Sequence, residues 1–291
     1  MATQADIESH YDVDNDFFAL FLDERYLGYT CGVWDRATNL EQSQIDKFQR
    51  LADYANILPG HKVMDVGCGW GGLLKYIAEK YSNAKAHGVT LSSNQAEYIN
   101  DLKLPNVSAD NCSWEDYAQP EKKYDAIVCV CALEHFATHE ESTANVQREI
   151  YKTFFDWCLN VSTPEAQIGL QSIVITRPPK NLAELKASKY LQEKVFPGSA
   201  LSCISDIQAA IIDKYEISSA NRIGLDYVTT LAEWKKNLEK NKAVIVGRYG
   251  QALFDHYIIY FDSATVCFES GYWDVYQVSL KRATPIRVLS R

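Results

Sequence analysis

The sequence contains one segment with the composition of a tight ligand-binding turn. Residues 63–72 read Val-Met-Asp-Val-Gly-Cys-Gly-Trp-Gly-Gly, a strand-like apolar run that leads directly into glycines. Glycine has no Cβ, so the backbone can turn sharply there and come close to a ligand. The spacing of Gly67, Gly69 and Gly72 satisfies the dinucleotide pattern, so the glycines alone do not distinguish NAD from S-adenosylmethionine.

The residues around these glycines favour S-adenosylmethionine. A dinucleotide site needs an acidic residue about 20 positions later, at the tip of the second strand, to hold the ribose hydroxyls. That tip is residues 88–91, Gly-Val-Thr-Leu, which contain no carboxylate. Instead, Asp65 stands just before the first glycine, where it can order the turn and favour the cationic end of a methionine moiety. We therefore expect S-adenosylmethionine as the cofactor.

A second pair of chemically useful residues, Glu134 and His135, follows the fourth predicted strand. The carboxyl ends of the strands form the edge where doubly wound sheets bind ligands. Methyl transfer from a sulfonium is an in-line displacement, so its site must exclude water, align the acceptor and accommodate positive charge. Carboxylates and aromatic faces suit that purpose. The structural alternative is a pair that caps the next helix.

These residues need a scaffold of alternating strands and helices. Short β-rich runs alternate with amphipathic stretches from about residue 62 onward, which indicates a parallel sheet with crossover helices. The predicted strands are 62–66, 85–90, 107–111, 124–130 and 167–175, and the predicted helices between them are 71–81, 93–102 and 141–159. The expected fold class is therefore α/β, with a doubly wound, mostly parallel, Rossmann-like sheet.

Additions to this core are predicted on both sides. Residues 14–22 and 40–58 are helical in pattern, so residues 1–60 are expected to form an N-terminal helical cap, and residues 61–291 the core. An insertion at about 176–205 has the pattern of a helical lid. Two later helices, 227–240 and 250–270, and a final strand, 274–280, complete the chain, with an antiparallel closing pair.

Composition narrows the functional classes. The 291 residues are 47% hydrophobic and 23% charged, as in an ordinary globular protein, and no apolar run approaches the roughly 18 to 20 residues that cross a bilayer. With no secretory pattern at the N-terminus, we expect a cytoplasmic protein without integral membrane contact. The net charge of −9 opposes nucleic-acid binding. The eight cysteines are scattered and suggest neither a disulfide framework nor a metal site.

The ordered motifs resemble the cyclopropane-fatty-acyl and mycolic-acid cyclopropane synthases, a family of S-adenosylmethionine-dependent methyltransferases with relatives among plant alkaloid N-methyltransferases. The resemblance implies a class I Rossmann-like methyltransferase. It covers almost the whole chain. Its motifs are His10-Tyr11-Asp12, Asp16-Phe17-Phe18, Tyr29-Thr30-Cys31, the segment 65–71, Thr90-Leu91-Ser92 with Gln95, Ser113-Trp114-Glu115, 133–136, Phe196-Pro197-Gly198, Asp226-Tyr227 with Leu231 and Trp234, and residues 271–275.

The resemblance also implies a path for the cofactor. Tyr29 and Thr30 would cover the methionine end, with Asp65, Gly67 and Gly69 beneath it, Thr90, Leu91 and Gln95 at the ribose, Ser113, Trp114 and Glu115 at the adenine end, and the Val130 backbone at the sulfonium. Structural roles remain open for several of them. Trp114 could belong to the core, and Thr90 and Gln95 could be a helix cap and a surface amide.

One departure from the family bears on the reaction. In the family's cyclopropane synthases a bound bicarbonate removes a proton. Glu134, Tyr227 and backbone near Cys31 and Val130 match the groups that hold this anion, but a histidine on the fifth strand is absent, and Gln171 or Ser172 takes its place. The opening of the lid, Arg177-Pro178-Pro179, also differs.

These departures favour a small natural-product-like acceptor, either an indole or alkene carbon or an amine. Glu134, His135 and Tyr227 are then the expected catalytic residues. The alternative is a cyclopropane-fatty-acid or mycolic-acid synthase that acts on lipid double bonds. The sequence leaves the oligomeric state open, a homo-oligomer included.

Overall fold

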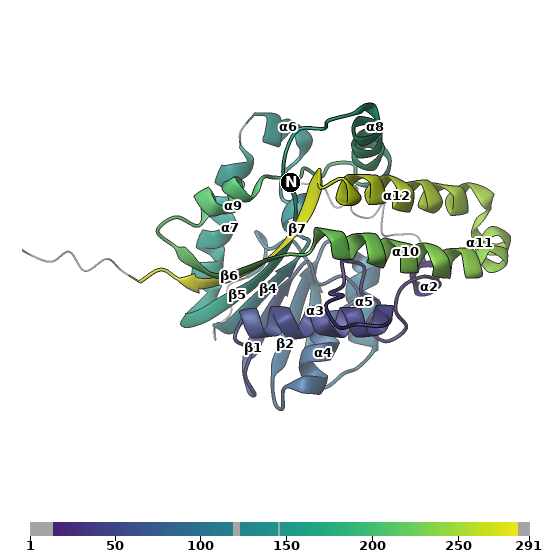
Figure 1. Ribbon diagram of the computed structural model, residues 1–291. Helices are drawn as coiled ribbons and strands as arrows, with labels where there is room; N and C mark the ends of the chain where they lie inside the picture. The colour runs from purple at the N-terminus through teal and green to yellow at the C-terminus, as the bar shows by residue number, and fades with distance from the viewer. Residues whose placement is uncertain (1–13, 119–122, 145, 285–291) are drawn as a thin grey trace, which may run out of the picture.

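One seven-stranded sheet organises the molecule, as Figure 1 shows for a computed structural model that describes residues 14–118, 123–144 and 146–284. The strands are β1 (Lys62–Val66), β2 (Lys85–Thr90), β3 (Val107–Asn111), β4 (Tyr124–Val130), β5 (Ser162–Ile175), β6 (Tyr215–Arg222) and β7 (Trp273–Arg282). Their order is β3-β2-β1-β4-β5-β7-β6. β1 to β5 run parallel, and β7 is antiparallel to both neighbours. The predicted doubly wound sheet and its antiparallel closing pair are confirmed.

The central strands form because their sequences are apolar on both faces, as buried parallel strands require. In β1 residues 63–66 are all buried, and in β4 residues 126–129 are buried as well. Asp65 is the one charged residue within the buried part of β1. A carboxyl group in such a strand is costly unless it has a partner, so its position already indicates a ligand site.

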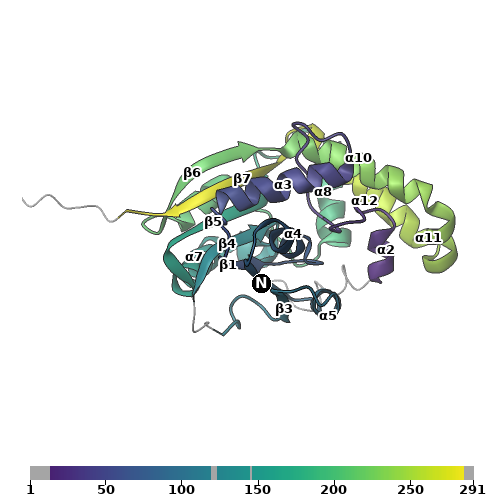
Figure 2. The ribbon, with the colours of Figure 1, turned by 90° about the horizontal axis from the view of Figure 1, so that it is seen from below.

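Helices cover both faces of the sheet. α3 (Leu40–Tyr54), α4 (Gly72–Lys80) and α5 (Ser93–Asp101) share one hydrophobic core with β1 and β4, and Figure 2 shows α3 beside α4. α7 (Gln147–Val161) packs on the other face with its own core, and α9 (Ile204–Ala210) packs against α7. Side chains begin two of these helices, since Asn39 caps α3 and Ser92 caps α5.

A third hydrophobic cluster joins helices from the two ends of the chain. It contains α2 (Asn15–Ala19), α8 (Leu182–Tyr190), α10 (Gly224–Lys240), α11 (Lys242–Tyr249) and α12 (Gln251–Glu269). Phe17 lies edge-on to Tyr257 with ring centroids 4.7 Å apart, and Phe21 contacts Trp234 at 6.2 Å. α10 and α12 run alongside each other in Figure 1. This helical layer brings the aromatic N-terminal segment next to the insertion and the late helices.

Some predicted boundaries are wrong. The helix predicted over 141–159 is two helices, α6 (His139–Thr143) and α7, because the Val146 N–H bonds the Glu141 carbonyl and closes α6. α9, α11 and β6 were not predicted. The insertion holds α8 and a π-helical segment, Leu191–Val195. His10, Tyr11 and Asp12 lie outside the described residues. Within the described ranges, every helix is too short or too polar to span a membrane.

Candidate active site

A cavity opens at the carboxyl ends of β1, β2 and β4, around the glycine-rich turn. We call it the turn cavity. It is lined by residues from the turn, from the segment before α3 and from the strand ends: Tyr26–Thr30, Lys47, Phe48, Asp65–Trp70, Gly72, Leu73, Val89–Leu91, Gln95, Cys112–Trp114, Val130–Ala132, His135 and Phe136. Of the predicted cofactor-binding residues, all except Glu115 are among them. The structure therefore brings residues from six segments of the chain, within 26–30, 47–48, 65–73, 89–95, 112–114 and 130–136, to one cavity.

The turn needs glycine for two separate reasons. Gly67, Gly69 and Gly71 have φ angles of 76°, 55° and 74°, in the left-handed region that disfavours side chains. At Gly67 a Cβ would also lie 2.5 Å from the Ala132 Cβ, on the loop after β4. Any larger residue at position 67 would push the turn away from β4 and into the cavity.

Asp65 faces this cavity with an unused hydrogen-bonding atom. The residue is 2% exposed, and among the described residues its Oδ1 has no hydrogen-bond partner. Burial raises the pKa of Asp65 to about 7, and the nearby Lys47 lowers it only in part. A buried carboxylate with a free oxygen is an acceptor prepared for a ligand N–H.

Thr90 and Gln95 are neither a helix cap nor a surface amide. Ser92, not Thr90, accepts the N-terminal hydrogen bond of α5, from the Gln95 N–H at 3.3 Å. The Thr90 hydroxyl donates to Gln95 Oε1 at 2.7 Å, and both side chains are buried while they line the cavity. Because this hydrogen bond fixes the orientation of both side chains, they can form hydrogen bonds with the hydroxyl groups of a ribose.

Trp114 belongs to the core and lines the cavity at the same time. Its ring packs on Phe154 and Trp157 at 5.3 and 5.9 Å, and it is 4% exposed. Glu115 lies differently: it is exposed and does not line the cavity, because the Ser113 hydroxyl bonds Asp116 and holds the segment in a turn.

A second cavity adjoins the turn cavity, and we call it the apolar cavity because apolar and aromatic side chains make up most of its lining. Its volume of about 330 Å³ exceeds the volume of one water molecule, about 30 Å³, by an order of magnitude, so it can hold an organic acceptor. It is lined by Tyr29, Thr30, Cys131, Glu134, His135, His139, Ser142, Ile173, Ile175, Ser188, Leu191, Gln192, Phe196, Ser199–Leu201, Tyr227, Tyr260, Tyr272 and Trp273. Tyr29, Thr30, Cys131 and His135 line both cavities.

Glu134 is the one carboxylate among the described residues that line the apolar cavity. Its Oε1 accepts the Ile173 N–H at 2.6 Å, which orients the carboxyl group, while Oε2 has no partner among the described residues. Burial raises the pKa of Glu134 to about 7. A carboxylate with that pKa can stabilise positive charge or accept a proton at neutral pH.

His135 and Tyr227 reach the same cavity from different elements. Burial lowers the pKa of His135 to about 4, so its ring is neutral near pH 7, and Nδ1 shares a 2.7 Å hydrogen bond with the Ser199 hydroxyl. Tyr227 lies one turn into α10, whose first residue, Gly224, donates its N–H to Asp274 Oδ1 at 2.9 Å. The three predicted catalytic side chains thus share one cavity wall.

Gln171 and Ser172, the two candidates for the position of the family's histidine, make different contacts in the structure. Gln171 is buried, donates to Cys131 Sγ at 3.4 Å and accepts from Gln277 at 2.8 Å, so it lies behind Cys131 and lines neither cavity. The Ser172 hydroxyl donates to the Ile173 carbonyl at 3.3 Å. An amide held by two neighbours supplies no titrating group at this position.

Lys47 is a site residue that the sequence analysis missed. It lies on α3 among residues 44, 48 and 51, on the buried stripe of the helix, and it is 1% exposed. Its Nζ donates to Thr30 Oγ1 at 2.7 Å and to Gln44 Oε1. The signal in the sequence was a charged residue at a core position of an amphipathic helix.

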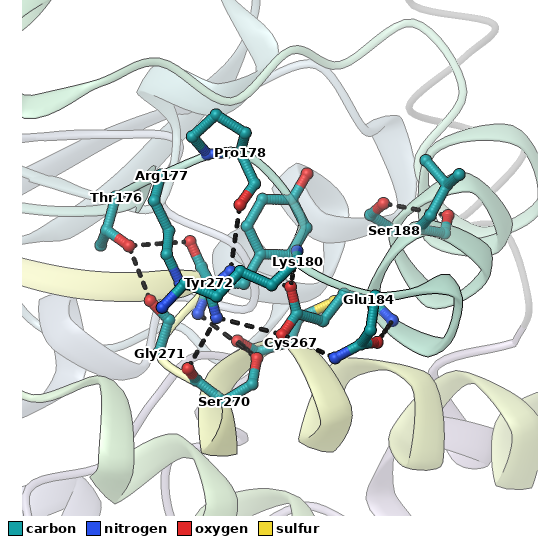
Figure 3. A network of polar contacts seen from close by, with 12 residues as sticks. Thr176, Arg177, Pro178, Lys180, Glu184, Ser188, Cys267, Ser270, Gly271 and Tyr272 are labelled. Atoms are coloured by element: carbon teal, nitrogen blue, oxygen red, sulfur yellow. Dashed lines mark hydrogen bonds and ion pairs between the residues drawn. The ribbon is translucent and has the colours of Figure 1, made fainter.

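A partly buried ion pair fastens the lid (Figure 3). Arg177 donates through two nitrogens to both oxygens of Glu184 on α8, at 2.8 and 3.0 Å, and through Nη2 to the Ser270 carbonyl at the end of α12. Glu184 is 2% exposed, and the hydrogen bonds from Arg177 lower its pKa to about 2. The clamp holds α8, which contributes Ser188 to the apolar cavity, against the turn before β7.

Removing the clamp is expected to loosen the lid. In an Arg177→Met protein, the buried Glu184 loses its charged partner, so we expect proteolysis within α8 to accelerate by roughly one order of magnitude and the KM for the acceptor to rise. Lys189→Met is the matched control, because Lys189 is also on α8 and its 3.7 Å pair with Glu193, in the π-helical segment that follows, is exposed. Equal proteolysis rates for the two variants would contradict a role for the clamp.

Comparisons with known proteins agree with this geometry. The family model for mycolic acid cyclopropane synthetase matches residues 1–278. Cyclopropane mycolic acid synthase 2 of Mycobacterium bovis is 30% identical over 291 residues, which cover 94% of this chain and 93% of that protein. Cyclopropane mycolic acid synthase 1 of Mycobacterium tuberculosis is 27% identical and covers 96% of this chain and 97% of its own length.

Solved structures give the same result. Cyclopropane synthase MmaA2 from Mycobacterium tuberculosis superposes with a TM-score of 0.86 at 24% identity, and cyclopropane synthase CmaA1, complexed with SAH and CTAB, with 0.85 at 27% identity. Each covers 96% of this chain and 98% of its own. The fold is that of the class I methyltransferases. The chain belongs to the mycolic acid cyclopropane synthetase family of S-adenosylmethionine-dependent enzymes.

Proposed function

We propose that this enzyme transfers the methyl group of S-adenosylmethionine to a carbon–carbon double bond in an acyl chain, with the cofactor in the turn cavity and the acceptor in the apolar cavity. The observation that carries the proposal is the lining of the apolar cavity. Apolar and aromatic side chains dominate it, and Glu134 is the one side chain of fixed charge among the described residues that line it. A hydrocarbon fits such a wall, and an anionic acceptor finds no cation there.

The relatives support a lipid acceptor over the small natural-product acceptor that the sequence departures favoured. The curated relatives are named as cyclopropane mycolic acid synthases, and they match this chain over nearly its full length. The Gln171 position does not oppose a lipid. The residue at position 171 affects only how the proton is removed after methyl transfer. The side chains that line the apolar cavity determine which acceptor can bind.

The site residues can perform the two steps that this reaction needs. Bound S-adenosylmethionine supplies an electrophilic methyl group. The alkene electron pair forms the new carbon–carbon bond as the methyl–sulfur bond breaks, which leaves a cation on the acceptor beside the Glu134 carboxylate. Ring closure then breaks a C–H bond of the transferred methyl group, and its electron pair forms the second ring bond. Glu134, with a pKa of about 7, can take that proton.

A product assay tests the proposal. The enzyme is incubated with methyl-labelled S-adenosylmethionine and one acceptor in each of three separate reactions. The acceptors are vesicles of a cis-mono-unsaturated phospholipid, an indole and a secondary amine. We expect label in the lipid, with cyclopropane resonances in its NMR spectrum. Label in the indole or amine and none in the lipid would overturn the lipid assignment and leave methyl transfer intact.

The absence of the family's histidine yields a separate expectation. The carboxamide of Gln171 is already held by Cys131 and Gln277, and it cannot supply the charged donor that an imidazole offers a bicarbonate ion. We therefore expect turnover to be unchanged, within about twofold, when carbonate is removed by degassing. A clear restoration of activity by added bicarbonate would show that the anion binds without the imidazole.

The same replacement favours a second candidate function, methyl transfer to a small aromatic carbon or an amine. Such acceptors quench the charge through their own π-system or lone pair and need no dedicated base. The indole and amine reactions of the product assay address this candidate directly.

A further inference from the structure

A buried lysine stands beside the turn cavity, and the proposed reaction does not use it. Lys47 is 1% exposed, and it is the one lysine or arginine among the described residues that line the cavity, just as Asp65 is the one carboxylate. Burying an ammonium group is costly unless it is paired and hydrogen-bonded. Two neutral oxygens, Thr30 Oγ1 and Gln44 Oε1, accept from its three N–H groups, and the centroid of the Phe48 ring lies 4.5 Å from Nζ. One N–H is therefore left without an oxygen or nitrogen acceptor among the described residues.

Lys47 also determines which hydrogen bonds the Thr30 hydroxyl group can make. An ammonium group has only donors, so Thr30 Oγ1 must accept from it, and the Thr30 hydroxyl proton is left to donate elsewhere. Thr30 lines both cavities. The Gln44 amide donates to the Thr30 carbonyl at 3.0 Å and holds the backbone of this loop against α3. Two donors, one charged and one polarised by that charge, are thus available at one end of the turn cavity.

Asp65 lacks a hydrogen-bond donor, because no N–H or O–H group of the described residues donates to its Oδ1. One lysine and one aspartate among the residues that line the cavity match the two charges of an α-amino-carboxylate. We propose that Lys47, with Thr30, recognises the carboxylate of the methionine moiety of S-adenosylmethionine, while Asp65 receives its ammonium group. The inference rests on the identity of the cofactor and not on the acceptor proposed above.

A series of ligands tests this inference in the wild-type protein. Calorimetry compares S-adenosylhomocysteine with its decarboxylated analogue, which keeps the ammonium group, and with methylthioadenosine, which has neither charge. Because charge-assisted hydrogen bonds are strong, loss of the carboxylate is expected to weaken binding by roughly 10- to 100-fold. Equal affinities for S-adenosylhomocysteine and the decarboxylated analogue would overturn the inference without any variant.

The variant Lys47→Met then assigns the effect to this residue. Its affinity for S-adenosylhomocysteine should fall to that of wild type for the decarboxylated analogue, while its affinity for methylthioadenosine stays within about threefold. An equal loss for all three ligands would show that Lys47 only supports the fold. Lys75→Met is the control, since this lysine of the neighbouring α4 donates to the Arg25 carbonyl and lines neither cavity.

A pH series on the wild-type protein provides an independent measurement if the variant does not fold. Burial lowers the pKa of Lys47 to about 8, against the opposing effects of Asp23, Cys131, Cys31 and Asp65. Above pH 8 the empty site loses the positive charge. The ratio of affinities for S-adenosylhomocysteine and its decarboxylated analogue should therefore fall as pH rises through 8. A ratio that is constant from pH 7 to pH 9 would contradict the assignment. Product analysis does not enter either test, so failure here leaves the lipid proposal unaffected.

Discussion

Glu134→Gln is expected to lower kcat by about two orders of magnitude or more, because the variant keeps the shape of the side chain and removes both its charge and its proton-accepting ability. Affinity for S-adenosylhomocysteine should stay within about twofold, since Glu134 lines the apolar cavity and not the turn cavity. Single-turnover measurements with a labelled methyl group give the rate. Glu140→Gln is the control, because Glu140 lies on α6 nearby and is exposed.

The pH dependence gives a second signature of the same residue. Burial raises the pKa of Glu134 to about 7, so the carboxylate is protonated below that pH and charged above it. The kcat of the wild-type protein should therefore rise as pH increases through about 7, and this limb should be missing in Glu134→Gln. Turnover of the variant within about twofold of the parent would remove Glu134 from the chemistry.

Asp65→Asn is expected to weaken the binding of S-adenosylhomocysteine by roughly 30-fold or more, because it removes the charge that the buried site offers to the ligand ammonium group. The same change should stabilise the empty protein by about 1–3 kcal/mol at pH 8, since a desolvated carboxylate is replaced by a neutral amide. Calorimetry and denaturant unfolding measure the two effects. Opposite signs for affinity and stability would distinguish a binding residue from a structural one.

The pH dependence of stability follows from the raised pKa of Asp65. The folded protein holds this proton up to about pH 7, whereas the unfolded chain releases it near the ordinary value of 3.8. The favourable contribution is thus complete below the unfolded value and is lost as pH rises through 7. Asp65→Asn should lack this decline. Asp125→Asn on β4, whose carboxylate accepts the Lys62 N–H, serves as the control. Unchanged ligand affinity in Asp65→Asn would mean that Asp65 orders the turn and does not bind the ligand.

Much of the fold could be predicted because local pattern and burial agree. The bounds predicted for β1 to β4 are those observed. β1 and β4 are short apolar runs that are buried in the sheet, whereas β2 and β3 are more polar and lie toward its edge. β6 was missed because seven of its eight residues are exposed, so its pairing depends on β7 and not on a hydrophobic pattern. The break between α6 and α7 was missed because the apolar stripe of α7 dominates the range 141–159, whereas α6 has no buried residue and begins at a capping box on Thr138, before that range.

The site residues also include some that could be predicted from the sequence and some that were missed. The residues on the turn and the strand ends could be predicted, because topology alone places them at one edge. Lys47 was missed although it is a charged residue at a core position of α3, because its contacts with Thr30 and Gln44 form only when α3 packs on the preceding loop. Ser199, which bonds His135 from 64 positions away, likewise has no local signal.

The position of β7 has a consequence for biosynthesis. This late strand pairs with β5 over nine residues, from Gln167 to Ile175, and separates β5 from β6. It also carries Asp274, which anchors the start of α10, and Trp273, which lines the apolar cavity. A nascent chain that has reached α12 on the ribosome therefore still has an unpaired edge on a central strand, which is a hazard for aggregation. Translation must deliver residues 273–282 before the sheet can close, so the active site stays incomplete until this segment has been synthesised.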